Sequence, residues 1–240
     1  MRAEVSSSEA ERQAVQQDNT PIELTRAVED FLKAVFTLQA QGERVSTNDI
    51  ADMLQRTQPT VTDMAQRLMT AGLIDYQKYK GVMLTAAGQE IALRMIRRHR
   101  LIELYLVREL GYSLAEVHEE AEKLEHAVSE RFIEALAQRL DDPQIDPHGD
   151  SIPAADGTIA ERDLQPLTEL PARQTATISR LKATSGEMLE HLLERGFQLG
   201  AQVEVIARDP FDGPITALVD GAQRVIGHNA AACVDVEAEE

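Results

Sequence analysis

Two histidines and two carboxylates fall within nine residues of this sequence, at His118, Glu122, Glu125 and His126. On an α-helix, which advances by about 100° per residue, these four side chains would lie within about a third of a turn. A second predicted helix carries His99 and Glu103, four residues apart and again on one face. Imidazoles and carboxylates gathered in this way are typical ligands of divalent metals. The pattern favours a metal site over the alternative, an exposed acidic face with incidental histidines.

A helical carboxylate–histidine cluster can also form a di-metal catalytic centre, but such centres repeat Glu-x-x-His on two helices. Here Glu125 and His126 are adjacent and the pair occurs once. The chain has no P-loop, nucleophile elbow or His-Glu-x-x-His motif. We therefore expect no enzymatic activity and no small-molecule substrate, with a di-metal enzyme as the alternative. The remaining histidines are expected in a linker or on the surface: His148, His191 and His228.

Three short helices and a hairpin are predicted to precede the metal-binding pattern. Apolar residues recur at helical spacing in residues 21–39, and Ser46 opens a capping motif before a second short helix. A third helix is expected from Thr57 to Thr70, with Thr57 as its N-cap. Residues 73–84 predict two short strands. This order is typical of a winged helix-turn-helix.

The third helix of such a motif enters the major groove of DNA, with its N-terminal residues against the base edges. Small or polar residues occupy that end here: Thr57, Gln58, Pro59, Thr60, Thr62 and Asp63. Phosphate contacts are expected from Lys78 and Lys80 in the wing and from Arg67 on the helix. The alternative is that the threonines only cap the helix and the lysines are only solvated. We expect double-stranded DNA as the partner.

The net charge of −17 argues at first against a nucleic-acid partner. Its distribution is uneven. Residues 21–100 carry eleven Lys and Arg against nine Asp and Glu, a net charge of +2, whereas residues 141–240 carry seven against nineteen, a net charge of −12. Because local charge governs contact with phosphates, the N-terminal part remains compatible with DNA binding.

The rest of the chain predicts a helical part followed by a small β domain. Helical spacing runs from Thr85 to Leu106 and resumes over residues 113–140, in one or two pieces. Residues 141–157, which contain three prolines and two glycines, predict a linker. Beyond it a helix is expected at 185–194, and strands are expected at 176–178, 201–207, 216–219, 223–226 and 233–236.

Composition restricts the class of protein and its compartment. The chain has 240 residues, 43% of them hydrophobic, enough for one large domain or for two to three small ones. Residues 1–20 are polar, lack the apolar core of a signal peptide and are expected to be disordered. No apolar run reaches the length of a membrane span. The single cysteine, Cys233, excludes a disulfide framework within one chain and suits a reducing compartment. We expect a cytoplasmic protein with no membrane partner.

The span from Glu23 to Gly157 resembles the diphtheria toxin repressor family, which comprises iron-dependent repressors and manganese transport regulators. The segments that carry the resemblance are VEDFLKAVFTL, QPTVTDMAQRLMTAGLI, KYKGVMLTAAG, RRHRLIELYL and VHEEAEKLEHAVSE. The region from LTELPARQTATISRL onward looks like the small Src-homology-like barrel, also called FeoA-like, of longer members.

The resemblance implies a mainly α fold with a small β C-terminal domain. Its parts would be a disordered arm (1–20), a winged helix-turn-helix domain (21–90), a helical dimerisation and metal-binding domain (91–140), a linker (141–157) and a FeoA-like small β-barrel (158–240). It implies a homodimer that binds operator DNA when loaded with metal and so represses genes of metal uptake and homeostasis.

Two sets of metal ligands follow from the same resemblance. Asp30 in the first helix matches a ligand position, and it would share one site with Glu122, Glu125 and His126. The ancillary site of the longer members corresponds to His99, Glu103 and His118. In this scheme the metal couples the first helix of the DNA-binding domain to the dimerisation domain.

Two positions bear on which metal is bound. Iron-type members carry Met and Cys where this chain has Asp30 and Glu122, whereas manganese-type members carry two carboxylates. Oxygen ligands suit Mn²⁺, so the resemblance favours Mn²⁺, with Fe²⁺ as a secondary effector. Lys33 stands where a manganese-type member has a further carboxylate. Arg180 and Ala183 align with Glu and Gln ligands of iron-type members, so no metal contact is expected from the β domain.

The role of the β domain stays open at this point. One hypothesis is that it tunes the metal response or steadies the dimer. The alternative is an interaction module, in which the β domain binds a protein or membrane partner and DNA binding is vestigial.

Overall fold

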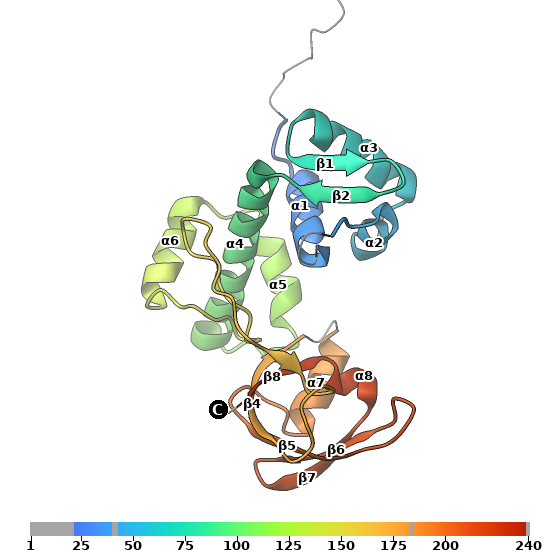
Figure 1. The fold of residues 1–240 in the computed structure, drawn as a ribbon. Helices are drawn as coiled ribbons and strands as arrows, with labels where there is room; N and C mark the ends of the chain where they lie inside the picture. The colour runs from blue at the N-terminus through green and yellow to red at the C-terminus, as the bar shows by residue number, and fades with distance from the viewer. Residues whose placement is uncertain (1–21, 40–42, 183–184, 239–240) are drawn as a thin grey trace, which may run out of the picture. The chain divides into compact units, whose positions relative to one another are not determined.

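The computed structural model describes residues 22–39, 43–182 and 185–238 (Figure 1). The expected disordered arm, residues 1–20, lies outside the described residues. The described residues fold as two compact units, which meet between Ala92 and Leu93. Within the described ranges, no helix is both long enough and apolar enough to cross a membrane.

The N-terminal unit consists of three helices followed by a two-stranded hairpin. The helices are α1 (Arg26–Leu38), α2 (Thr47–Met53) and α3 (Gln58–Thr70), and the antiparallel strands are β1 (Ile74–Gln77) and β2 (Gly81–Leu84). The side chain of Ser46 accepts a hydrogen bond from the backbone N–H of Asp49, which caps α2 as the sequence predicts. The predicted winged helix-turn-helix is confirmed.

The apolar faces of these three helices pack together in one hydrophobic core. Phe31 of α1, Ile50 of α2 and Leu68 of α3 are fully buried in it. Val45 exchanges two backbone hydrogen bonds of 2.8 Å with Val82, which ties the chain before α2 to the hairpin. Because α3 buries only one face in this core, its other face remains exposed with its polar side chains.

The helical part of the C-terminal unit is built on α4 (Ala86–Leu110), a helix that begins in the N-terminal unit. The region predicted as helical at 113–140 consists of two pieces, α5 (Val117–Leu124) and α6 (Glu130–Arg139). Ser129 separates them and caps α6 by accepting a hydrogen bond from the N–H of Phe132. Leu101 of α4, Val117 of α5 and Ile133 of α6 share one core, so the three helices hold one another in place.

The β domain contains a six-stranded antiparallel sheet with the strand order β3-β8-β4-β5-β6-β7. The strands are β3 (Gln165–Pro166), β4 (Thr175–Leu181), β5 (Gln202–Arg208), β6 (Ile215–Val219), β7 (Ala222–Ile226) and β8 (Val234–Ala238). All five predicted strands are present, and β4 extends to Leu181, beyond its predicted end.

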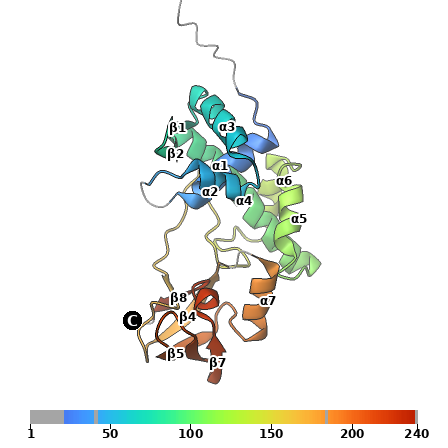
Figure 2. The same ribbon diagram turned by 90° about the vertical axis from the view of Figure 1, so that its right-hand side faces the viewer.

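Two helices complete the β domain, α7 (Gly186–Glu194) and α8 (His228–Ala231). Leu192 of α7 is fully buried in the same core as Ile178 of β4 and Val205 of β5. Figure 2 shows α7 beside the strands. The domain therefore has a single apolar core between its sheet and its longer helix.

The sequence predicts a linker at residues 141–157, but in the structure part of this segment is a packed loop. Ile145 and Ser151 form an antiparallel bridge that closes the loop, which we call the 145–151 loop. Inside it, Oδ1 of the buried Asp146 accepts hydrogen bonds from the N–H groups of His148 (2.8 Å) and Asp150 (2.9 Å). Prolines and glycines are as typical of tight turns as of open linkers, so composition does not distinguish the two.

Candidate metal centre and nucleic-acid interface

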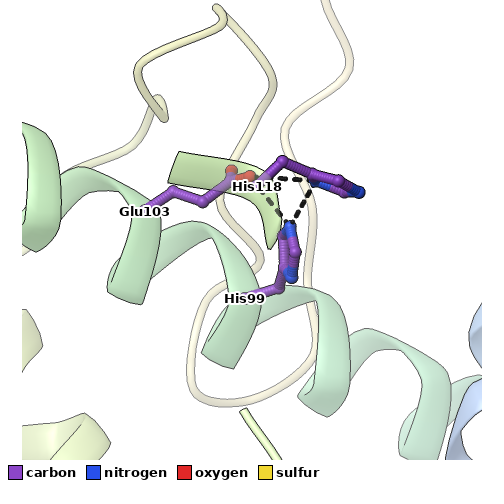
Figure 3. Close-up of side chains that lie close together, drawn as sticks. All are labelled: His99, Glu103 and His118. Carbon is purple, nitrogen blue, oxygen red and sulfur yellow. Dashed lines mark hydrogen bonds and ion pairs between the residues drawn. The ribbon is translucent and has the colours of Figure 1, made fainter. Parts of the chain in front are cut away.

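Three of the predicted ligands meet between α4 and α5 (Figure 3). His99 and Glu103 project from one face of α4, and His118 comes from the first turn of α5. Nε2 of His99 lies 2.9 Å from Oε1 of Glu103 and 3.0 Å from Nδ1 of His118. Nδ1 of His118 lies 3.2 Å from Oε1 of Glu103. The spacing of four residues on α4 therefore places the side chains of His99 and Glu103 together against His118.

These distances fit one face of a metal coordination sphere. Ligand bonds of about 2.1 Å at right angles place neighbouring ligand atoms roughly 3.0 Å apart. The three atoms are separated by 2.9, 3.0 and 3.2 Å, so one cation could contact all of them with ordinary bond lengths. Two imidazoles and one carboxylate are also the ligand types that first-row divalent cations take. The residues present thus fit a divalent metal ion.

Glu125 extends this group on its buried side. Helix α5 ends at Leu124, so Glu125 is its C-cap and His126 follows in a turn, beyond the helix on which the sequence pattern places them. Oε2 of Glu125 lies 2.6 Å from Nδ1 of His99, and its Oε1 lies 3.3 Å from Nε2 of His126. The imidazole of His99 therefore bridges Glu103 and Glu125, and it joins two ligand sets that the resemblance keeps apart.

Glu122 and Asp30 take no part in the buried contacts that join His99, Glu103 and Glu125. The side chain of Glu122 is 50% exposed, and its Oε1 lies 3.5 Å from Nε2 of His118. Asp30 lies on α1 in the N-terminal unit, where its Oδ2 lies 3.7 Å from Nε of Arg26. The roles of Glu122 and Asp30 as metal ligands, like those of the other five predicted ligands, remain predictions.

The 145–151 loop adds two groups that the sequence analysis missed. Nδ1 of His148 lies 3.6 Å from Oε2 of Glu103, and the potential ligand atoms of Glu103, Asp146 and His148 all lie within 4.8 Å of one another. The expectation that His148 is a linker or surface residue is wrong, because its side chain is only 15% exposed. The available signal was a histidine two residues after an aspartate in Asp-Pro-His-Gly, which linker-like composition obscured.

Burial and neighbouring charges shift the pKa values of this group. Burial would raise the pKa of Glu103, but hydrogen bonds from His118, His148 and His99 outweigh it and hold the pKa well below its ordinary value. Burial, together with nearby carboxylates, raises the pKa of Asp146 to about 6. Burial would lower the pKa of His148, but the carboxylates of Glu103 and Asp146 raise it to about 9. The imidazolium of His148 thus balances the buried negative charge of Glu103, and a bound cation would balance the same charge.

The N-terminal end of α3 presents the side chains predicted to contact DNA. Thr57 is the N-cap residue, and its Oγ1 shares a 2.9 Å hydrogen bond with Oγ1 of Thr60 instead of bonding the helix backbone. Thr62 is half-buried, and the other predicted contacts on α3 are exposed: Thr57, Gln58, Pro59, Thr60, Asp63 and Arg67. Among the described residues, this face of α3 lies outside the apolar core of the N-terminal unit and is accessible to solvent.

The tip of the hairpin carries two cations beside an aromatic ring. Lys78 and Lys80 flank Tyr79, whose side chain is 93% exposed and whose backbone has a φ of +66°. Nζ of Lys78 lies 5.0 Å from the centre of the Tyr79 ring. Both lysines are exposed, as a wing that meets backbone phosphates requires. Their contacts with DNA remain predictions.

Family models cover most of the chain. Residues 23–82 match the N-terminal DNA-binding domain of iron-dependent repressors, and residues 85–154 match their metal-binding and dimerisation domain. Residues 165–238 match the FeoA domain. The cluster of His99, Glu103 and His118 on α4 and α5 thus lies in the segment that matches a metal-binding domain.

Individual relatives extend over nearly the same span. The chain is 28% identical to the iron-dependent repressor IdeR of Mycobacterium leprae (strain TN), over 90% of this chain and 98% of that protein. It is similar to a solved manganese-dependent transcriptional repressor in complex with manganese, with 36% identity, a TM-score of 0.83 and coverage of 88% of this chain and 100% of the other. The structure of ScaR with bound Zn²⁺ is 34% identical, with a TM-score of 0.76 and coverage of 88% and 98%.

Proposed function

The chain belongs to the iron-dependent repressor family, and from this premise we propose that Mn²⁺ is the cation that activates it. It is a metal-dependent transcriptional repressor and not an enzyme, and its partners are operator DNA and a second copy of the chain. Fe²⁺ is the alternative effector. We also propose a cytoplasmic location, since a repressor acts where the chromosome lies.

The donor set carries the proposal for Mn²⁺. Among the described residues, the groups that could hold a metal consist of imidazoles and carboxylates without a cysteine. Cys233 lies in the β domain, where its Sγ donates to the carbonyl oxygen of Asn229. Mn²⁺ competes weakly for nitrogen and sulfur ligands and is retained best by oxygen-rich sites, whereas thiolates and thioethers favour softer cations. The solved relative with manganese supports the same choice.

We assign the ligands to two sets. The first comprises Asp30, Glu122, Glu125 and His126. The second comprises His99, Glu103 and His118. Asp146 and His148 form a neighbouring group with the same Glu103, and we assign them as further ligands beside this set. When bound, the cation supplies the positive charge that the buried carboxylates Glu103 and Glu125 require.

Metal binding can change DNA binding only if the cation prefers one conformation of the protein. Asp30 belongs to the DNA-binding unit, and the other ligands of the first set belong to the dimerisation part. A cation shared by them would be fully ligated in one arrangement of these parts. In a homodimer that preference would set the spacing of the two recognition helices along the operator.

Fluorescence anisotropy on labelled DNA tests the proposal. The DNA should come from upstream of metal-transport genes in the source genome, and Mn²⁺, Fe²⁺ or a chelator should be present. We expect specific binding that appears with Mn²⁺ and disappears with the chelator. Binding that is indifferent to metal would contradict a sensor function, and activation by Fe²⁺ at lower free concentrations than Mn²⁺ would overturn the choice of metal.

Single substitutions in the first ligand set extend this test. Glu122→Ala and His126→Ala should each abolish metal-dependent DNA binding while circular dichroism shows an unchanged fold. Glu119→Ala is a matched control, because Glu119 is an exposed carboxylate of the same helix outside the cluster. A wild-type Mn²⁺ response in either ligand variant would show that the first set is assigned incorrectly.

A further inference from the structure

The loop that carries Asp146 and His148 is held by helix α4 on one side. Nε of Arg100 lies 3.6 Å from Oδ2 of Asp146, and its Nη2 lies 3.4 Å from Oδ1 of Asp150. Arg97, nearly one turn earlier on α4, donates a 2.7 Å hydrogen bond to the carbonyl oxygen of Pro153. These contacts attach the 145–151 loop and the residues just after it to α4, but they hold the loop on one side only.

Strand β4 of the β domain holds the other side of the loop through its backbone. The N–H of Leu181 donates a 2.8 Å hydrogen bond to the carbonyl oxygen of His148. The next loop residue, Gly149, has a φ of +94°, and a Cβ added there would stand 2.2 Å from the carbonyl oxygen of Ser179. Only glycine permits both this backbone conformation and this approach. The loop therefore packs directly on β4 beside His148.

A chain of ion pairs reinforces this contact. Asp235 on β8 is only 1% exposed, and Nε of Arg180 donates a 2.8 Å hydrogen bond to its Oδ2. On the far side of the same guanidinium, Nη1 lies 3.5 Å from Oδ1 of Asp150 in the loop. The register between β4 and β8 shifts between Ile178 and Arg180, an irregularity of the kind that redirects side chains. The buried carboxylate thus orients Arg180 toward the loop.

We propose that the β domain positions two of the ligands: strand β4, acting through Arg180 and Leu181, holds the 145–151 loop so that Asp146 and His148 face Glu103. Arg180 is then a positioning residue and contacts no metal. The inference rests on the proposed function for the role of Asp146 and His148 as ligands, whereas the hold on the loop exists without metal. It gives the β domain a task that its sequence alone does not indicate.

Two full-length variants release the loop in different ways. Arg180→Met with Asp235→Asn removes the ion pairs without leaving a buried carboxylate unpaired. Gly149→Ala keeps the ion pairs and forces the loop away from Ser179. Arg224→Ala is the matched control, because Arg224 lies on β7 and donates to the carbonyl oxygen of Arg195. Arg180→Lys preserves the charge but replaces a planar fork with a single point donor.

Hydrogen exchange with chelator present measures the hold on the loop directly. We expect the amides of residues 145–151 to exchange at least about tenfold faster in both release variants and at the wild-type rate in Arg224→Ala. Mn²⁺ binding, followed by the paramagnetic resonance signal of the free ion, is then measured in a Glu122→Ala background, where the first ligand set is incomplete. We expect an affinity about tenfold weaker in the release variants and partly restored by Arg180→Lys.

The two measurements separate the inference from the proposed function. Unchanged loop exchange together with unchanged Mn²⁺ affinity in both release variants would overturn the inference. Faster exchange across the whole β domain would also count against it, since the variant would then have unfolded the domain. Faster exchange confined to the loop, in a chain whose wild-type form ignores Mn²⁺, would support the hold on the loop and contradict the proposed metal. If the double variant fails to fold, loop exchange and Mn²⁺ affinity in Gly149→Ala alone test the inference.

Discussion

Nδ1 of His148 lies 3.6 Å from Oε2 of Glu103, so a loop residue and a helix residue 45 positions apart form a partly buried ion pair. The pKa of His148 is raised to about 9 and that of Glu103 is held well below its ordinary value, so both groups are charged at neutral pH. A proton on His148 therefore occupies a position that a metal ion could take. The pair makes the metal-free protein sensitive to pH.

Above neutral pH, the metal-free protein should lose stability. The pKa of His148 is raised from 6.5 to about 9 by folding, so its contribution is fully present below pH 6.5 and is lost as the pH rises through 9. Between pH 7 and 9.5, with chelator present, the free energy of unfolding should fall by about 2 kcal/mol more in the wild type than in His148→Gln. Urea denaturation followed by circular dichroism measures this difference.

His228→Gln is the control for this experiment. His228 is a partly exposed residue of the β domain, and its Nε2 lies 3.9 Å from Oδ1 of Asp212. The control should show the wild-type pH dependence. If His148→Gln showed it as well, the imidazolium of His148 would not be stabilised by folding.

The sequence predicts the local elements of this protein better than it predicts the metal cluster. Spacing of four residues on a helix was sufficient to place His99 beside Glu103, because helix geometry is fixed. The contact of His99 with Glu125 and the approach of His148 to Glu103 join segments that are distant in sequence, and no local pattern encodes them. The end of α5 at Leu124 was missed for a related reason, since helix boundaries depend on packing as well as on propensity.

The wing lysines should contribute to DNA affinity without contributing to sequence preference. Lys78 and Lys80 are exposed at the hairpin tip and would contact phosphates, which are the same at every sequence. Lys78→Ala and Lys80→Ala should each weaken binding to specific and unrelated DNA alike. Each should also reduce the slope of log affinity against log salt by about 1. Anisotropy titrations at several salt concentrations measure both effects.

Lys123→Ala on α5 is the control for the lysine variants, because Nζ of Lys123 pairs with Glu120 at 3.2 Å away from the wing. Its salt dependence should equal that of the wild type. A loss of affinity restricted to one base position in either wing variant would contradict the assignment to phosphates.

Two glycines near the hairpin should respond differently to the same substitution. At Gly81, whose φ is +103°, an added Cβ would stand 2.3 Å from the carbonyl oxygen of Val45, so Gly81→Ala must displace the chain that ties α2 to β2. At Gly72, whose φ is +73°, an added Cβ meets nothing within 4 Å. Gly72→Ala should therefore cost about 1 kcal/mol from backbone strain alone, and Gly81→Ala should cost more than about 2 kcal/mol. Thermal unfolding compares them, and equal losses would contradict a close approach at Gly81.

The choice between oxygen and sulfur ligands at position 122 should decide which metal activates DNA binding. Glu122→Cys replaces a hard carboxylate with a thiolate, which favours softer cations. We expect activation by Mn²⁺ to require roughly tenfold more free metal, while Fe²⁺ and Co²⁺ gain relative to it. Glu119→Cys, on the same helix but outside the cluster, should leave the ranking unchanged, which separates a ligand effect from the mere presence of a thiol. Anisotropy titrations with buffered metals give the ranking. An unchanged order of Mn²⁺, Fe²⁺ and Co²⁺ in Glu122→Cys would mean that Glu122 does not bind the activating cation, and the preference for Mn²⁺ would then need another source.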